Sequence, residues 1–287
     1  MEFNTRTLSP QESRVVLALS EGKRLEIERS EVIKLLGVSP KAADHVIESL
    51  RQKGWLERAS WGKYVFIPPD QGPDAVGEGN LFALASRIAD PYYIGYGSAA
   101  AHYGLTTQHR RVIILVTTAH VRPRELAETR VRIINPKPDK FFGFGRVDVL
   151  GFTVMMSDRE KTAVDCIDRP ELAGGVAEAA SILAVASRRL DWQKSADYLD
   201  RMDSTALVRR FGWVMDHVGA EMPADVRGRL LQRAEAGPKT WLGPNPKTKM
   251  ERAIGYDKIW RLTINVAREE LRDSAGLGRR KKLKRDA

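Results

Sequence analysis

Asp165 and Asp168 are three residues apart, so on a helix their carboxylates would lie on one face. Such a pair can hold a divalent cation or act as general acid and general base. Arg169 follows directly and Glu171 lies two residues further on. This mixture of charges is typical of a local ion-pair network or a helix turn. The pattern therefore favours a structural role, and we predict no catalytic residue here.

A second acidic pattern loosely resembles the site of restriction-type, metal-dependent endonucleases. Asp139 and Asp148 precede Asp158 and Lys161 in a strand-rich region. Such a site needs an acid two residues before the lysine, because only then do both side chains project from one strand face. Arg159 occupies that position. A nuclease is therefore the least favoured alternative.

The sequence lacks the usual signatures of bound cofactors. Cys166 is the only cysteine, and the five histidines show no ligand spacing with it. No Gly-Lys-Ser/Thr element is present, and the FFGFG run at 141–145 is too sparse in glycine to cradle a phosphate. We therefore predict no metal, no nucleotide cofactor and no enzymatic activity.

The strongest functional candidates lie on a helix that Ser39 can cap and Pro40 can open. Its apolar residues recur at helical spacing and form the inward face: Ala43, Val46, Ile47 and Leu50. Asp44 and Glu48 would repel phosphates, so we expect this helix to approach DNA by its N-terminal end. The predicted contacts are Ser39, Lys41, Ala42, His45, Ser49, Arg51 and Lys53, with Lys41, Ala42 and His45 best placed for base edges.

A β-hairpin is predicted directly after this helix, with strands at 55–58 and 64–67. Trp55, Tyr64 and Phe66 are assigned to its core side. The tip can reach a flanking phosphate track or the minor groove. The predicted contacts there are Arg58, Ser60, Trp61 and Lys63.

Two earlier helices must position the DNA-reading helix. One is predicted at about 10–19 after Ser9, and another begins with Ser30 as its cap and ends at Gly37. Helix, helix, turn, helix and hairpin in this order indicate an N-terminal winged helix-turn-helix at 1–70. Prolines and glycines then predict a linker at 71–80.

The remainder predicts a larger mixed α/β domain at 81–275, whose C-terminal half is mostly helical. Helical patterns occur at 81–88 and 98–103, strands are predicted at 112–118, 131–134, 147–150, 152–156 and 260–266, and the clearest helices at 177–190 and 206–218. The overall fold class is therefore α+β. Residues 276–287 are predicted to form a basic disordered tail.

The net charge of the 287-residue chain is +10, and residues 276–287 contribute six basic residues and one acidic one. Half of the excess charge thus belongs to the tail, so charge alone does not establish DNA binding. No apolar run approaches the roughly 18 residues of a membrane span. We therefore expect a cytoplasmic protein whose partner is double-stranded DNA and which has no membrane association.

The order of several motifs resembles the AbiEi family, the antitoxins of AbiE-type abortive-infection systems. The residues that carry this resemblance are LRQKGWL at 50–56, GKY at 62–64, YYIG at 92–95, SAAAHYGLT at 98–106, EKTAVDCIDRPELAGG at 160–175, FGW at 211–213 and WRLTIN at 260–265. The long spacer at 122–145 and the basic tail are less typical of the family.

The resemblance implies a repressor that binds repeats in the promoter of its own operon, within a type IV toxin–antitoxin system. It also implies a functional partner, a toxin with a nucleotidyltransferase-like fold, which the antitoxin opposes without a stable complex. A ligand-sensing winged-helix regulator remains an alternative. A sizeable apolar pocket with convergent polar groups in the second domain would favour it.

Overall fold

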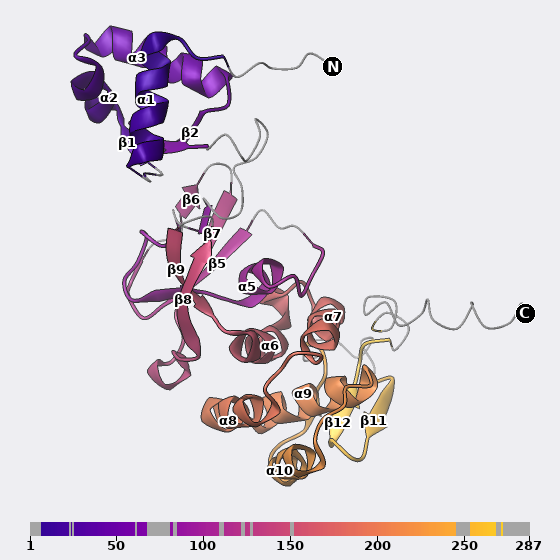
Figure 1. Ribbon diagram of the computed structural model, residues 1–287. Helices are drawn as coiled ribbons and strands as arrows, with labels where there is room; N and C mark the ends of the chain where they lie inside the picture. The colour runs from indigo at the N-terminus through magenta and orange to yellow at the C-terminus, as the bar shows by residue number, and fades with distance from the viewer. Residues whose placement is uncertain are drawn as a thin grey trace, which may run out of the picture.

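The chain has the predicted α+β architecture, with a winged helix-turn-helix followed by a larger mixed domain (Figure 1). The computed structural model describes residues 7–22, 24, 26–60, 62–67, 81–82, 85–108, 112–121, 124–126, 129–149, 152–244, 253–267 and 271. The predicted linker at 71–80 and the predicted tail at 276–287 lie outside these residues. Within the described helices, none is both long enough and apolar enough to cross a membrane.

The N-terminal domain packs three helices against a three-stranded antiparallel sheet of order β1-β3-β2. Its elements are α1 (Pro10–Glu21), β1 (Glu26–Glu28), α2 (Arg29–Leu36), α3 (Pro40–Gln52), β2 (Leu56–Ser60) and β3 (Lys63–Phe66). The sequence does not predict β1, because three residues are too few to show an alternating pattern. The predicted hairpin is confirmed, and Trp55 and Phe66 stack in the core with ring centroids 6.3 Å apart.

The helix ends show why the turn between α2 and α3 forms where it does. Gly37 ends α2 with φ of +65°, a left-handed conformation that glycine adopts readily. Ser39 then caps α3 by accepting a hydrogen bond from the amide of Ala42. The predicted cap at Ser30 is wrong. Glu28 and Glu31 instead form a reciprocal capping box, so the cap lies two residues earlier and α2 begins directly after β1.

The second domain is built on a six-stranded mixed sheet of order β6-β7-β5-β4-β9-β8. The strands are β4 (Tyr92–Ile94), β5 (Val112–Thr117), β6 (Arg124–Leu126), β7 (Thr129–Ile134), β8 (Phe144–Val149) and β9 (Phe152–Ser157). The central strand β4 is parallel to β9 and antiparallel to β5. It was not predicted, because it contains only three residues. Helices α5 (Tyr96–His102) and α6 (Arg159–Asp168) lie beside this sheet (Figure 1).

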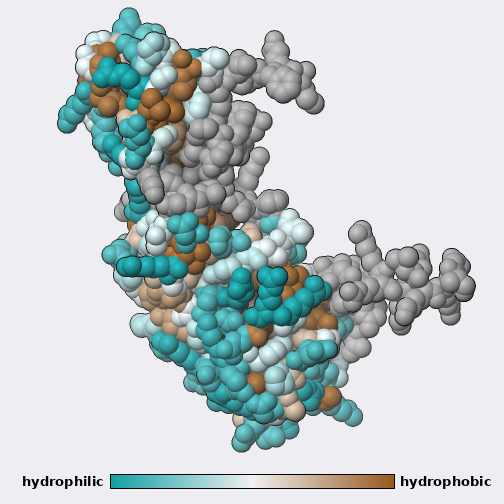
Figure 2. All heavy atoms as spheres, in the orientation of Figure 1, coloured by the Kyte–Doolittle hydropathy of each residue, from teal (hydrophilic) through white to brown (hydrophobic). Residues whose placement is uncertain are grey.

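The C-terminal half adds a layer of helices and a small three-stranded sheet of order β10-β12-β11. Its elements are α7 (Val176–Ala186), α8 (Trp192–Met202), α9 (Thr205–His217), α10 (Ala224–Ala234), β10 (Thr240–Trp241), β11 (Gly255–Asp257) and β12 (Leu262–Ile264). The predicted helix at 177–190 ends early, because a turn follows Ala186 before Asp191 caps α8. Hydrophilic residues cover much of the visible face of this half (Figure 2).

Among the described residues, an ion pair joins the two domains where β1 approaches the second domain. The guanidinium of Arg87 lies 2.8 Å from the carboxylate of Glu26. In Figure 1 the N-terminal domain lies next to β6, an edge strand of the six-stranded sheet, and the helical layer lies on the far side of the sheet from the N-terminal domain. The outer surface of α3 therefore does not face the helical layer.

Candidate nucleic-acid interface

Helix α3 separates a buried apolar face from an exposed polar one. Ala43, Val46, Ile47 and Leu50 are buried in the core of the N-terminal domain, as predicted. Lys41, Asp44, His45 and Glu48 are exposed on the other side. Three of these four residues occupy the first two turns, where the positive end of the helix dipole also lies. The exposed polar side chains of α3 therefore gather towards the N-terminal end of the helix.

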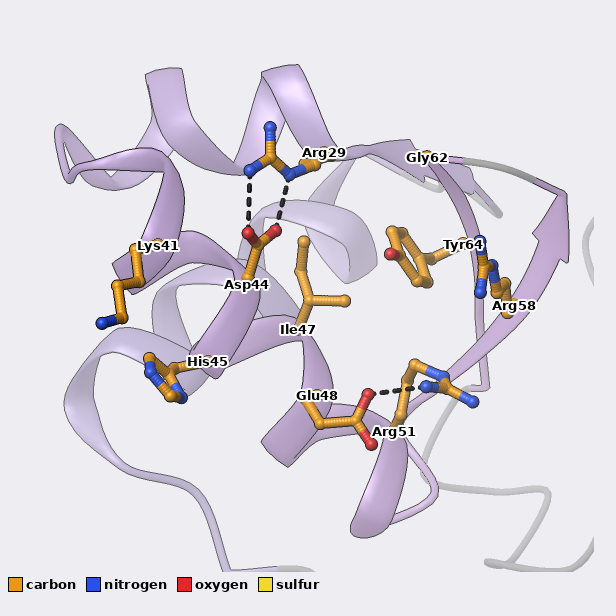
Figure 3. A pocket seen from close by; sticks show the side chains of 10 residues that line it. All are labelled: Arg29, Lys41, Asp44, His45, Ile47, Glu48, Arg51, Arg58, Gly62 and Tyr64. Atoms are coloured by element: carbon orange, nitrogen blue, oxygen red, sulfur yellow. Dashed lines mark hydrogen bonds and ion pairs between the residues drawn. The ribbon is translucent and has the colours of Figure 1, made fainter.

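A groove of about 660 Å³ runs between α3 and the hairpin (Figure 3). Its lining residues come from α2, α3 and both strands of the hairpin, and they are Arg29, Lys41, Asp44, His45, Ile47, Glu48, Arg51, Arg58, Gly62 and Tyr64. Four of these side chains are basic and two are acidic, which gives the lining a net charge of +2. The fold therefore brings Arg58 of β2 beside Lys41, His45 and Arg51 of α3.

Both acidic residues of the groove are held in ion pairs. Asp44 accepts two hydrogen bonds from Arg29, at 2.5 Å from Nε and 2.8 Å from Nη2. These hydrogen bonds lower the pKa of Asp44, so its carboxylate stays ionised and paired. Glu48 pairs with Arg51 at 2.6 Å. The expected repulsion between these acids and phosphates is therefore partly offset by neighbouring cations.

Lys41 and Arg58 are the groove cations that form no ion pair among the described residues. Lys41 projects from the first turn of α3 and Arg58 from β2, so they lie on opposite walls (Figure 3). His45 lies one turn after Lys41, also exposed. Beside the turn of the hairpin, Lys63 pairs with Glu28 at 3.2 Å, and both side chains are about half exposed. Lys41, His45 and Arg58 thus form the accessible donor set of the groove.

Three of the predicted contact residues have structural partners outside the groove. Ser39 caps α3, as described above. The ammonium of Lys53 donates to both carboxylate oxygens of Glu12 on α1, at 2.8 Å each. Ser49 also hydrogen-bonds this carboxylate. Burial raises the pKa of Glu12, but these hydrogen bonds outweigh it and lower the pKa to about 2. Lys53 and Ser49 therefore hold α3 against α1.

Two predicted residues at the hairpin tip receive no structural test. Trp61 lies outside the described residues. Ser60 pairs with Lys63 through the backbone, after an irregularity in the register. Gly62 follows with φ of +73°, a conformation that favours glycine in a tight turn.

Sequence reasoning missed two residues of the groove. Arg29 was overlooked because it begins α2 and approaches α3 only through the turn between them. Tyr64 was assigned to the core, whereas its half-buried ring also lines the groove. The sequence signal that could have identified Arg29 is a basic residue at the first position of α2, because the N-terminus of α2 adjoins α3.

Three acidic residues at and just before α6 take part in structural contacts: Asp158, Glu160 and Asp165. Asp158 caps α6 and accepts a hydrogen bond from the hydroxyl of Tyr198 at 2.7 Å. The ammonium of Lys194 lies 3.0 Å from both Asp158 and Glu160. Lys161, the lysine of the nuclease-like pattern, is buried and pairs with Asp165. In the part of the chain that the structure describes, no group of three acidic, histidine or cysteine residues is arranged to hold a metal.

The fold has a counterpart among solved structures. The crystal structure of the Rv2827c protein from Mycobacterium tuberculosis superposes with a TM-score of 0.66 and 19% sequence identity. The match covers 95% of this chain and 97% of the other. No family model matches the sequence, and no curated protein does. At this identity the likeness concerns the fold, which the two chains share over nearly their full lengths.

Proposed function

We propose that this protein is a sequence-specific DNA-binding repressor that reads duplex DNA with α3 and the adjacent hairpin. The observation that carries this proposal is the groove in which Lys41, His45 and Arg58 are accessible while Asp44 and Glu48 are paired. A recognition helix needs exposed hydrogen-bond donors near its N-terminus and a second surface for the flanking phosphates. Helix α3 and the hairpin supply both.

The geometry gives each accessible donor a different role. Lys41 and His45 lie on the exposed face of α3, so in a major groove they would reach base edges. Arg58 lies across the groove on β2, where it would contact a phosphate beside the site. Arg29 is held by Asp44 and supports the position of α3 rather than contacting a base. No catalytic step is part of this proposal.

The biological role that we propose is the antitoxin of an AbiE-like, type IV toxin–antitoxin system. The support is the order of sequence motifs, several of which have defined places in the fold. Gly212 of the FGW motif packs against Trp260 of the WRLTIN motif, and Lys161 and Asp165 of the central motif pair in the core. The protein would then bind repeats in its own promoter and oppose a nucleotidyltransferase-like toxin without a stable complex.

A gel-shift titration tests the DNA-binding proposal. The full chain is titrated against its own upstream region and against a scrambled duplex of equal length, at low and at physiological salt. We expect the upstream duplex to be retained selectively at physiological salt. Equal, salt-sensitive binding to both duplexes would contradict sequence-specific recognition.

Substitutions then locate the reading surface. The double variant Lys41→Ala/His45→Ala should lose the preference for the upstream duplex, while Arg188→Ala, which removes an exposed cation of the second domain, should retain it. Circular dichroism checks that both variants are folded. Preserved selectivity in the double variant would mean that α3 does not read the sequence.

The antitoxin role requires a separate experiment. Coexpression of this chain with the toxin candidate encoded beside it should restore growth, and copurification of the two should yield no stable complex. Growth arrest despite soluble expression of both proteins would contradict the antitoxin role while leaving the DNA-binding result unaffected.

A further inference from the structure

A small cavity of about 220 Å³ lies in the second domain, remote from α3. It is bounded by the end of α6, the start of α7, α9 and the segment after β10. The three helices are neighbours in Figure 1. Apolar side chains form much of its wall, and three charged residues also line it. The complete lining is Asp168, Pro170, Glu171, Gly175, Val176, Arg210, Leu242, Gly243 and Pro244.

Arg210 is the central charged residue of this cavity. Its Nε donates to the carbonyl oxygen of Trp241 at 2.8 Å, which fixes the plane of the guanidinium. Among the described residues, Arg210 forms no ion pair. Burial lowers the pKa of its guanidinium. The carboxylates of Asp168 and Glu171 attract this guanidinium, but neither forms an ion pair with it, and a partly desolvated cation without such a pair is unfavourable. Its two terminal nitrogens therefore offer a planar fork that matches a carboxylate.

The start of α7 adds further donors to the same cavity. Gly175 precedes the helix with φ of +103° and supplies no side-chain cap to its first turn. The first amides of a helix have no partner within the helix, and they attract negative charge. A side chain at Gly175 would meet no described atom within 4 Å, so there is open space beside the start of the helix.

The carboxylates of Asp168 and Glu171, which line the same cavity, would repel a ligand that is purely anionic. Asp168 lies 3.8 Å from the ammonium of Lys140, and Glu171 pairs with Arg169 at 2.9 Å. Each carboxylate has acceptor capacity beyond one cation. The cavity thus combines a guanidinium, two carboxylates and apolar walls. These three features match the carboxylate, the ammonium and the hydrocarbon part of a zwitterionic ligand.

We propose that this cavity binds a small apolar α-amino acid. The carboxylate would pair with Arg210, the ammonium would face Asp168 and Glu171, and the side chain would contact Val176 and Leu242. Inorganic phosphate fits less well, because it carries more negative charge past two carboxylates and has no apolar part. This proposal does not depend on DNA binding, since none of these residues lines the groove beside α3.

Isothermal titration calorimetry of the full chain tests the proposal with leucine, isoleucine, methionine and phenylalanine as probes. Three comparison ligands separate the contributions: 4-methylpentanoate lacks the ammonium, isoamylamine lacks the carboxylate, and inorganic phosphate lacks both the ammonium and the apolar part. We expect saturable binding of at least one amino acid, and at least tenfold weaker binding of the comparison ligands. No saturable binding of any amino acid up to roughly 10 mM would overturn the proposal.

Variants assign the ligand to this cavity. Arg210→Gln should weaken amino-acid binding at least tenfold, whereas Arg188→Gln, which removes an exposed cation, should bind as the wild type does. Val176→Phe fills the cavity without removing Arg210, so it tests occupancy even if Arg210→Gln folds poorly. Asp168→Asn/Glu171→Gln should weaken binding of the amino acid more than that of 4-methylpentanoate. Unchanged affinity in the folded Val176→Phe variant would place the ligand elsewhere and overturn the assignment.

Discussion

Arg29 at the first position of α2 and Asp44 in the second turn of α3 form a two-contact ion pair across the helix-turn-helix. The same guanidinium also donates to the carbonyl oxygen of Pro40 at 3.4 Å. The carboxylate that would otherwise repel DNA is thereby used to fix the angle between the two helices. The pair is exposed, so its effect is expected in DNA recognition more than in stability.

Asp44→Asn should strengthen binding to all duplexes and reduce the preference for the upstream sequence. The substitution releases Arg29 to contact a phosphate, which makes the negative slope of log affinity against log salt steeper by about 0.9. Gel shifts at several salt concentrations measure both effects. Asp139→Asn is the matched control, because it changes the net charge equally at an exposed site of the second domain. The same slope in both variants would contradict a local role for Asp44.

Lys41 and Lys53 lie on or just after the same helix but should affect different properties. Lys41→Ala should weaken operator binding and leave the melting temperature unchanged, because Lys41 is exposed and forms no ion pair in the described structure. Lys53→Ala should destabilise the N-terminal domain by about 2 kcal/mol, because the buried carboxylate of Glu12 loses its cation. Thermal unfolding and gel shifts on both variants measure this separation. If folded Lys53→Ala bound the operator as weakly as Lys41→Ala does, this separation of DNA binding from stability would be contradicted.

The Glu12–Lys53 pair should make the N-terminal domain sensitive to acid. The pKa of Glu12 falls from 4.5 to about 2 on folding, so its contribution is complete above pH 4.5 and is lost as the pH falls towards 2. This difference in pKa corresponds to about 3 kcal/mol. Denaturant unfolding of wild type and Glu12→Gln should show a gap at pH 7 that narrows below pH 4.5. Glu21→Gln, on the exposed end of α1, is the control. A gap that is independent of pH would show that Glu12 does not titrate in this way.

The local pattern of the sequence predicted α3 well because all its determinants lie within fifteen residues. Ser39 caps it, Pro40 begins it and four apolar residues define its buried face. The short strands β1 and β4 could not be predicted in this way, since three residues show no periodicity and their partners are distant in the chain. Strand β1, for example, pairs with β3 through contacts such as Ile27 with Tyr64.

The candidate interface was only partly predictable for a similar reason. An outward position on a helix identifies an exposed side chain, as for Lys41 and His45, but it does not identify the partner of that side chain. Lys53 was predicted to contact DNA, yet its partner Glu12 lies 41 residues earlier. Arg29 reaches the groove only because the turn at Gly37 brings α2 against α3. Side-chain pairing between elements is a property of the assembled fold.

The contact between Gly212 and Trp260 gives the sharpest test of the helical layer. A Cβ atom at Gly212 would lie 2.2 Å from the Trp260 ring, which is fully buried. The indole cannot easily move away, because its Nε1 donates to Asp216 at 2.7 Å. Gly212→Ala should therefore destabilise the second domain by about 2–3 kcal/mol, although alanine is the better helix former. Thermal unfolding followed by calorimetry measures the change.

Gly228→Ala provides the matched control, because Gly228 lies on the exposed face of α10 and a Cβ there would meet no described atom within 4 Å. It should stabilise the protein by about 0.5–1 kcal/mol through helix propensity alone. If Gly212→Ala lowers the free energy of unfolding and Gly228→Ala raises it, the destabilisation at Gly212 comes from the contact with Trp260 and not from the loss of glycine. If both variants were stabilised, the indole would have to be able to repack, and the FGW and WRLTIN motifs would not be coupled through this contact.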